Sequence, residues 1–368
     1  MKADIRSLNR EQLSTHFESW GQPSYRLDQL LHWLYSQRAT TWDSMTNLPK
    51  GLRENLAEHF RLDGITLARK QGSRDTTQKF LWRLTDGALI ESVIIPASPA
   101  LYGDASDRHT LCISTQVGCA YGCKFCASGL EGWKRNLRPE EIVNQILATE
   151  TWHRSNQPEG NPSAPTPSDD RLVNNIVVMG MGEPLANYDN LLQALTLLNA
   201  PWGGGIGARK ITISTSGLAP QIRRLAEEPL QFRLAISLHG ATDEVRQQIM
   251  PVNRKYPLKE LVEACDYYQE KKGRMMTLEY ILIAGINDHL EQTAPLAALA
   301  KRLHAKVNLI PYNQVEGLAW ERPSEAVQEA FLASLERRKV TATLRREKGH
   351  DIDAACGQLR LKTEKLEA

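Results

Sequence analysis

The spacing of hydrophobic residues divides the first hundred positions into two parts. From residue 1 to about 60 the apolar residues recur at helical spacing, as in LDQLLHWLY and LPKGLRENL. From about 65 to 96 the apolar runs shorten to FLWRL and LIESVIIP, which are bounded by the turn signals QGSRD and TDG. The pattern predicts a small helical module at residues 1–62, followed by a short β-rich connector at residues 63–107.

Six apolar runs alternate with helix-like stretches between residue 108 and about residue 350. The runs are TLCIST, NNIVVMG, KITISTSG, RLAISLHG, MMTLEYILI and KVNLIPY. This alternation predicts an α/β fold with a parallel sheet that closes fully or partly into a TIM-like (βα)6 barrel. In such folds the functional groups lie at the carboxyl ends of the strands, where this chain keeps Cys, Gly, Glu, Ser, His and Asn.

Two further segments lack a strand or helix pattern. Residues 155–170, SNQPEGNPSAPTPSDD, are rich in Pro, Ser and Gly and have little to bury. This composition predicts a surface insertion within the barrel rather than a domain boundary. Residues 351–368 follow the last repeat, and we expect them to form a C-terminal loop and tail.

Composition narrows the class of protein. The chain has 368 residues, of which 41% are hydrophobic and 24% charged, as in ordinary globular proteins. Its N-terminus has no apolar signal region, and no run approaches the roughly eighteen apolar residues that span a bilayer. We therefore expect a cytoplasmic protein with no membrane partner. A net charge of +2 does not by itself indicate nucleic acid, although residues 331–362 carry eight Lys or Arg against four acids.

The stretch CISTQVGCAYGCKFCASG, residues 112–129, holds four of the six cysteines. Cys119, Cys123 and Cys126 have the spacing C-x3-C-x2-C directly after the first predicted barrel strand. Three thiolates can ligate three irons of a [4Fe-4S] cluster and leave the fourth iron open for a substrate. Zinc is the alternative, but a structural zinc site needs four ligands and no nearby Cys or His pair completes one. A reactive iron–sulfur cluster is therefore favoured.

The cysteine spacing, placed after the first strand of a (βα)6 barrel, resembles the radical S-adenosylmethionine (SAM) superfamily. More closely, a set of motifs resembles the RlmN/Cfr family of radical SAM RNA adenine methyltransferases: LCISTQVGC, CKFCASG, KRNLRPEEIVNQI, GMGEPLANYDN, ITISTSG, LAISLHGATDEVR, VNLIPYN and DIDAACGQL. The N-terminal segments YRLDQLLHWLY and MTNLPKGLRENL also match, so the resemblance runs through nearly the whole chain. It implies one [4Fe-4S] cluster on the three loop cysteines, with SAM chelating the open iron.

The resemblance also implies roles for two further cysteines. Cys356, in DIDAACGQL, would take a methyl group from one SAM, and a second SAM would supply the radical that activates this methyl group. Cys112 would remove the ring proton of the adenine and form a disulfide with Cys356 to release the product. Without the flanking motifs, both cysteines could equally be small buried hydrophobes. Cys265, in the helical LVEACDYYQ, is expected to fill the core.

Polar groups after the later strands match the family's remaining SAM contacts. They are Gly182 and Glu183 in MGMGEP, Ser214 in ITISTSG, Ser237, Leu238 and His239 in AISLHG, and Asn313 in IPYN. Each polar group could instead cap a helix or satisfy backbone amides. Glu91, in LIESVIIP, matches a family carboxylate that acts as proton acceptor. However, a Glu in a small sheet is usually a surface residue, and 28 positions separate Glu91 from Cys119.

The resemblance implies methylation of adenine C2 in 23S rRNA, in the peptidyl transferase region, and of the adenine 3′ to the tRNA anticodon. The family members that methylate C8 and confer antibiotic resistance carry the same motifs, but the long N-terminal module favours C2 methylation for this chain. Two other classes stay open: a non-catalytic RNA-binding protein on an iron–sulfur scaffold, and a radical SAM enzyme acting on peptides or small molecules. The helical module, KRNLR at residues 134–138 and the basic C-terminal stretches could contact RNA phosphates. We expect a monomer that takes electrons from a donor such as flavodoxin.

Overall fold

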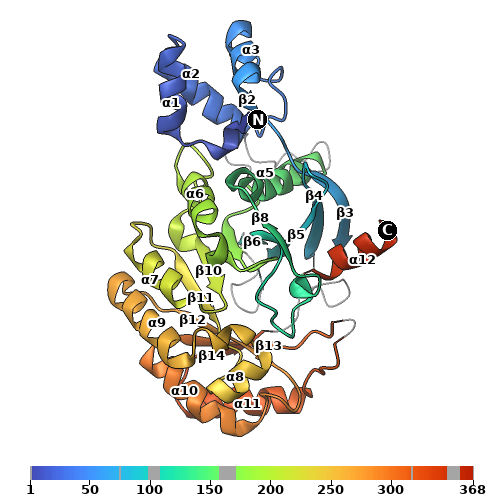
Figure 1. Cartoon of the computed structure of the whole chain (residues 1–368), viewed down its shortest axis with the longest axis vertical. Helices are drawn as coiled ribbons and strands as arrows, with labels where there is room; N and C mark the ends of the chain where they lie inside the picture. The colour runs from blue at the N-terminus through green and yellow to red at the C-terminus, as the bar shows by residue number, and fades with distance from the viewer. Residues whose placement is uncertain are drawn as a thin grey trace.

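A ten-stranded mixed sheet forms the centre of the computed structural model (Figure 1), which describes residues 2–73, 76–97, 108–156, 171–315, 318–345 and 357–367. Six successive strands of this sheet are parallel and coincide with the six predicted runs: β6 (His109–Cys112), β9 (Asn175–Val178), β10 (Ile211–Thr215), β11 (Arg233–Ser237), β12 (Thr277–Leu282) and β13 (Lys306–Pro311). The predicted α/β fold with a partial (βα)6 barrel is therefore confirmed.

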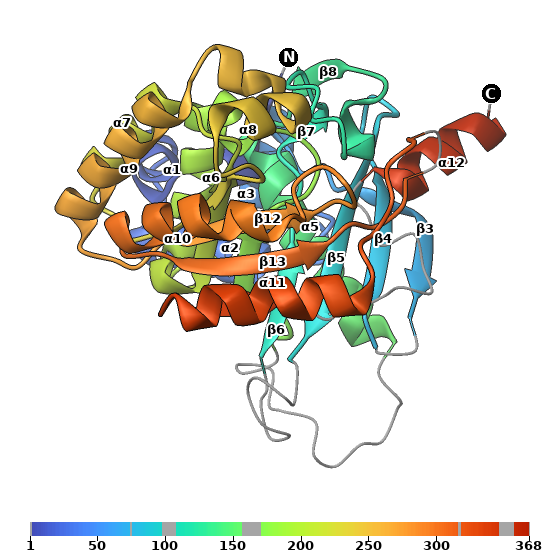
Figure 2. The ribbon, with the colours of Figure 1, turned by 90° about the horizontal axis from the view of Figure 1, so that it is seen from below.

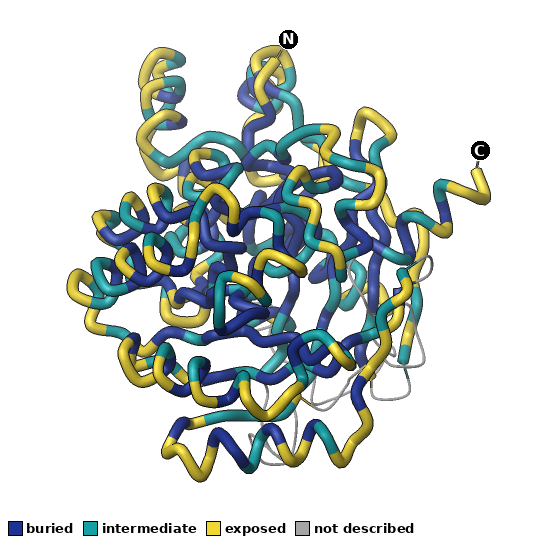
Figure 3. The backbone as a smooth tube through the Cα atoms, turned by 60° about the horizontal axis from the view of Figure 1, so that its bottom comes forward, coloured by how far each residue is buried: buried dark blue, intermediate teal, exposed yellow. Residues whose placement is uncertain are grey.

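Helices separate these strands along the chain and lie around the sheet (Figure 2). They are α5 (Pro139–Ser155), α6 (Tyr188–Asn199), α7 (Ala219–Glu227), α8 (Asp243–Ile249), α9 (Leu258–Lys272), α10 (Thr293–Arg302) and α11 (Glu325–Arg337). Short 3-10 helices complete the connections: Ile5–Ser7, Ala127–Gly129, Pro184–Asn187, Ala208–Lys210, Pro251–Arg254 and Leu290–Gln292. The strands are buried while the outward helical turns are exposed (Figure 3), as expected for a sheet covered by helices. Cys265 is fully buried in α9, so its predicted place in the core is confirmed.

The connector strands continue the barrel sheet instead of forming a separate sheet. β3 (Thr66–Gly72), β4 (Gln78–Arg83) and β5 (Leu89–Pro96) are antiparallel, and β5 pairs with β6 so that Val93 lies opposite Cys112. At the other edge, β14 (Ala342–Leu344) adds a seventh parallel strand that the sequence pattern does not indicate. A separate hairpin, β7 (Gln116–Gly118) and β8 (Trp133–Asn136), frames the loop that carries the three cysteines.

The N-terminal module consists of α1 (Arg10–Ser19), α2 (Ser24–Leu31), a π-helical turn (His32–Ser36) and α3 (Lys50–His59). Its two ends meet in the short pair β1 (Ala3–Asp4) and β2 (Phe60–Arg61). The buried Arg6 donates to the carbonyl oxygen of Asp63 and to Asn144 Oδ1 of α5, each at 3.0 Å. Apolar side chains of the module and of the barrel belong to one continuous core. The module is therefore docked on α5.

Residues Gln358–Glu367 form the helix α12. The sequence instead predicts a C-terminal loop and tail for this part of the chain. Leu359, Arg360 and Thr363 are buried on one side of this helix, which explains why it is ordered against the protein. Figures 1 and 2 both draw α12 beside the connector strands, and it contacts β5. None of the described helices is long and apolar enough to cross a membrane.

Candidate functional site

A cavity of about 280 Å³ lies at the carboxyl ends of the parallel strands. Most of the predicted site residues line it: Cys119, Cys123, Cys126, Gly182, Glu183, Ser214, Ser237, His239 and Asn313. Leu238 is buried next to Ser237 and His239 in the chain, while Cys112 on β6 and Glu91 on β5 are buried and do not line the cavity. Cys356 lies outside the described residues. The fold thus gathers segments that are distant in the sequence around one space.

The loop with the three cysteines is held by backbone hydrogen bonds. The Cys119 amide donates to Gly132 O (3.0 Å), which ties the loop to the β7–β8 hairpin, and the Lys124 amide donates to Ile249 O (3.0 Å) at the end of α8. The Cys126 amide donates to Cys123 O at 3.1 Å, which closes a turn between two of the thiols. The loop is therefore fixed from both sides of the cavity.

Burial raises the pKa of the Cys119 thiol to about 12, and it raises the pKa of Cys123 as well. Desolvated thiols of this kind hold their protons until a cation replaces them. Among the described residues, no three His, Cys, Asp or Glu side chains are grouped to hold a single metal ion. The three thiols instead line one cavity from one short loop, a donor set that fits a polynuclear iron–sulfur cluster.

Glu183 is the buried carboxylate of the cavity. Its Oε1 accepts from Thr215 Oγ1 (2.8 Å) and from the Leu185 amide (3.0 Å), and its Oε2 accepts from the Ser216 amide (2.7 Å). Burial raises the pKa of Glu183, and these hydrogen bonds oppose part of the rise. The carboxylate is thereby fixed between the ends of β9 and β10, where it can accept from a cationic group in the cavity.

Gly182 brings the backbone close to the β7 segment. Its φ is +100°, and a Cβ at this position would lie 2.5 Å from Gln116 Cβ. Gln116 Oε1 accepts from the Glu183 amide at 2.8 Å, so the same close contact orients the carboxylate residue. A side chain at position 182 would therefore displace Glu183.

Ser214, Ser237 and His239 form the adjoining wall. The two serine hydroxyls lie 3.4 Å apart on neighbouring strands. His239 has a left-handed backbone conformation (φ 54°), and its Nδ1 accepts from the Ile281 amide at 3.0 Å. Burial lowers the pKa of His239 to about 3, so the ring is neutral and carries its proton on Nε2. The wall thus offers two hydroxyls and a neutral imidazole.

Two charged residues of the site escape prediction from the sequence. Glu279, on β12, lines the cavity, and its Oε2 accepts from Asn308 Nδ2 at 2.7 Å. Its sequence signal is a single acid inside the apolar run TLEYIL. Arg246, on α8, is fully buried and donates to Leu238 O, Asn253 Oδ1 and Ser216 O. Its positive charge acts to lower the pKa of Cys123, so it lies within electrostatic reach of the cysteine loop.

Glu91 is buried, unlike a typical acid of a small sheet, with 3% of its surface exposed. Its carboxylate pairs with Lys79 Nζ at 2.9 Å and accepts from the amides of Gly357 and Arg360, each at 2.7 Å. Val93, two residues after Glu91 on β5, lies opposite Cys112 on β6. Glu91 is therefore two residues along β5 from the partner of Cys112 and is hydrogen-bonded to Gly357, the residue that follows Cys356.

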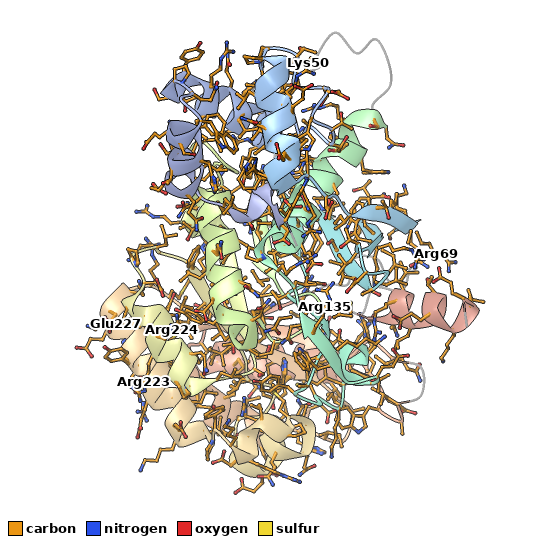
Figure 4. All side chains as sticks on the ribbon, turned by 45° about the horizontal axis from the view of Figure 1, so that its top comes forward. Lys50, Arg69, Arg135, Arg223, Arg224 and Glu227 are labelled. Carbon is orange, nitrogen blue, oxygen red and sulfur yellow. The ribbon has the colours of Figure 1, made fainter. Side chains whose placement is uncertain are left out.

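The predicted basic RNA contact KRNLR is largely engaged within the protein. Arg135, labelled in Figure 4, pairs with Asp86 (2.7 Å) and with Glu141 (2.8 Å), and Arg138 also pairs with Glu141. Lys134 is half exposed and is the more accessible cation of this segment. The two arginines therefore fasten the hairpin to the start of α5.

Comparison with known proteins adds two family matches. Residues 3–62 match the ribosomal RNA large subunit methyltransferase N-terminal domain, and residues 170–297 match the radical SAM superfamily.

The chain also resembles full-length proteins. It is 58% identical to "Probable dual-specificity RNA methyltransferase RlmN 3" of Opitutus terrae, over 96% of this chain and 93% of that protein. It is 45% identical to "Dual-specificity RNA methyltransferase RlmN" of Anaeromyxobacter dehalogenans, over 97% of this chain and 91% of that protein. The crystal structure of a radical SAM methyltransferase from Sphaerobacter thermophilus superposes with a TM-score of 0.87 at 41% identity, covering 97% of this chain and 98% of that one.

Proposed function

The chain belongs to the RlmN family of radical SAM methyltransferases, and on this premise we propose that it methylates C2 of adenine in ribosomal and transfer RNA. The targets would be an adenine of 23S rRNA in the peptidyl transferase region and the adenine 3′ to the tRNA anticodon. The observation that carries the proposal is the cavity at the strand ends, which gathers the cysteine loop, Glu183 and polar groups of successive strands. The dual specificity named for the relatives supports both RNA classes.

Membership of the radical SAM superfamily implies a [4Fe-4S] cluster and SAM. Cys119, Cys123 and Cys126 would hold a single cluster, and SAM would chelate its open iron. Glu183, fixed by three hydrogen bonds, would accept from the amino group of SAM. Ser214, Ser237, Leu238, His239 and Asn313 would form the walls around the rest of SAM.

The methyl group would reach the RNA through Cys356. When bound, the cluster and SAM supply the radical that removes one hydrogen atom from the S-methyl group of Cys356. The carbon radical would then add to C2 of the adenine, with the cluster supplying the one-electron oxidation of the adduct. We expect Cys112, which is buried at the carboxyl end of β6 beside the strand of Glu91, to act on this adduct. Its sulfur would take the ring proton and then attack Sγ of Cys356. That attack would break the bond to the transferred carbon, which would take up a proton to become the methyl group, and would form a disulfide that a thiol reductant would reopen. A donor such as flavodoxin would supply electrons to the cluster.

The RNA must present a single adenine to the cavity, because C2 is inaccessible in a stacked base. The docked N-terminal module and the exposed Arg337–Lys339 at the end of α11 supply surfaces for phosphate contacts away from the cavity. RNA substrates of both classes place the enzyme in the cytoplasm, where we expect it to act as a monomer.

Nucleoside mass spectrometry tests the proposal. The reconstituted protein is incubated anaerobically with SAM, a reductant, and unmodified 23S rRNA fragment or tRNA. We expect 2-methyladenosine in both RNAs and none with the Cys356→Ala variant. A product of 8-methyladenosine would instead indicate the C8 activity, and no methylated adenine from protein with a full cluster would contradict the proposal.

A further inference from the structure

The carboxylate of Glu91 accepts three hydrogen bonds from described residues. Oε2 accepts from Lys79 Nζ at 2.9 Å and from the Gly357 amide at 2.7 Å, and Oε1 accepts from the Arg360 amide at 2.7 Å. Glu91 is 3% exposed and the side chain of Lys79 is 0% exposed. The charges of the pair balance each other in the protein interior, where an unpaired charge would be costly.

These amides belong to the start of α12, Gly357 directly before the helix and Arg360 in its first turn. The first amides of a helix lack partners within the helix, and a carboxylate placed there is favoured by hydrogen bonding and by the helix dipole. Helices usually obtain this acceptor from a residue next to the helix in sequence. In α12 it comes from Glu91, 266 positions away from Gly357. Glu91 thus joins the start of the C-terminal helix to the connector sheet.

The same turn is also held against the cysteine loop. Gly357 has a φ of +87°, and a Cβ there would lie 2.8 Å from the Ser128 amide nitrogen, two residues after Cys126. Arg360 donates to Glu131 Oε2 at 2.8 Å on the same loop. The first turn of α12 is therefore fixed between Glu91 on one side and the segment following Cys126 on the other.

Gly357 directly follows Cys356, so its position determines where the chain enters the segment that carries this cysteine. We propose that Glu91, paired with Lys79, is a positioning residue that holds the start of α12 and thereby fixes the point at which the chain leaves the segment that carries Cys356. The inference rests on the proposed function only in giving Cys356 the role of methyl carrier. It differs from the proton-acceptor role implied by the family resemblance, because the carboxylate would act through the hydrogen bonds that it accepts from Lys79 and α12 and not by taking a proton from the substrate.

Two measurements separate these roles, and neither requires RNA. The first is hydrogen exchange at the amides of residues 357–361 in the cluster-loaded protein. The second is the fraction of Cys356 that becomes S-methylated with SAM and reductant alone, read by peptide mass spectrometry. In the Glu91→Gln variant we expect these amides to exchange about tenfold faster or more, since charge-assisted hydrogen bonds are lost. We also expect the rate of Cys356 methylation to fall by about tenfold or more, because a mispositioned reacting atom slows the reaction.

Matched variants keep the test independent of folding. Glu367→Gln removes the exposed ion pair with Arg83 at the other end of α12 and should change neither measurement. Lys79→Met removes the cation but leaves the Glu91 oxygens that accept from the Gly357 and Arg360 amides, so it should retain most of the exchange protection. If Glu91→Gln disturbs the fold through the loss of its ion pair with Lys79, the double variant Lys79→Met/Glu91→Gln removes both charges of this pair and should still show fast exchange.

The outcomes distinguish the inference from the proposed function. Loss of RNA methylation in Glu91→Gln, with wild-type exchange and wild-type Cys356 methylation, would overturn the positioning role and favour a proton acceptor. If the wild-type protein itself never methylates Cys356, the proposed function fails. Hydrogen exchange would still decide whether Glu91 holds α12.

Discussion

Close backbone contact at Gly182 makes this residue a sensitive position in the cavity. A Cβ there would lie 2.5 Å from Gln116 Cβ, at a φ of +100° that side chains rarely adopt. We expect Gly182→Ala to displace Glu183 and weaken SAM binding about tenfold or more, measured by calorimetric titration of the cluster-loaded protein. Gly207→Ala is the control, because a Cβ at that position meets no atom within 4 Å. Equal SAM affinities in both variants would contradict this account.

His239 should make stability depend on pH. Burial lowers the pKa of His239 to about 3, whereas an unfolded histidine titrates near 6.5. Between these values the unfolded state binds a proton that the folded state does not, so the free energy of unfolding falls as the pH falls from 6.5 toward 3.

The His239→Asn variant isolates this effect, because asparagine tolerates the left-handed backbone and offers an oxygen to the Ile281 amide. Between pH 7.5 and 5 the wild-type protein should lose about 2 kcal/mol more than the variant in denaturant unfolding. Identical losses would show that His239 is not kept neutral.

Sequence reasoning locates the cavity residues that belong to contiguous motifs, such as Glu183 in MGMGEP and His239 in AISLHG. It misses Arg246 and Glu279, because their importance depends on which segments the fold brings beside them. It leaves Glu91 open between the proton acceptor that the resemblance implies and a surface residue, since its partners Lys79 and Gly357 come from other parts of the chain. Burial of a charged residue is a property of its neighbours in space, and a single sequence does not display them.

The β7–β8 hairpin depends on one acid of α5. Glu141 accepts from Arg135 Nη1 (2.8 Å) and Nη2 (2.9 Å), and it also accepts from the Arg138 amide at 2.8 Å. Because the hairpin leads into Cys119, we expect Glu141→Gln to loosen the cysteine loop and release iron to a chelator about tenfold faster. Glu140→Gln, which disturbs one ion pair of Arg138, should release iron at the wild-type rate. Unchanged iron release from Glu141→Gln would mean that the hairpin does not support the loop.

Among whole elements, those with long periodic patterns were predictable. The six parallel strands and the N-terminal helices follow directly from apolar spacing. The strand β14 was not predictable, because its three half-buried residues are too few to show an apolar periodicity. α12 was not, because its ordering depends on an acceptor from β5 and on packing against the cysteine loop. The attachment of the connector strands to β6 likewise depends on long-range pairing.

At the scale of the whole molecule, Arg6 joins the N-terminal module to the barrel. It donates to Asp63 O and Asn144 Oδ1 at 3.0 Å and to Ala39 O at 2.5 Å. We expect Arg6→Met to loosen this docking, so that limited proteolysis separates the module faster and RNA affinity falls while SAM affinity is retained. Arg10→Met, which removes a partly exposed ion pair with Asp28, is the control. Wild-type proteolysis of Arg6→Met would contradict the role of Arg6 in docking.

The most direct test of the central claim follows the methyl group from cofactor to RNA. The protein is supplied with SAM carrying a fully deuterated methyl group and allowed several turnovers on unmodified tRNA, and the 2-methyladenosine is then analysed by mass spectrometry. A route through S-methyl Cys356 removes one hydrogen from the methyl group before transfer, so the product should contain two deuterium atoms and one ordinary hydrogen. A product that keeps all three deuterium atoms would show direct transfer from SAM and would contradict the carrier role of Cys356.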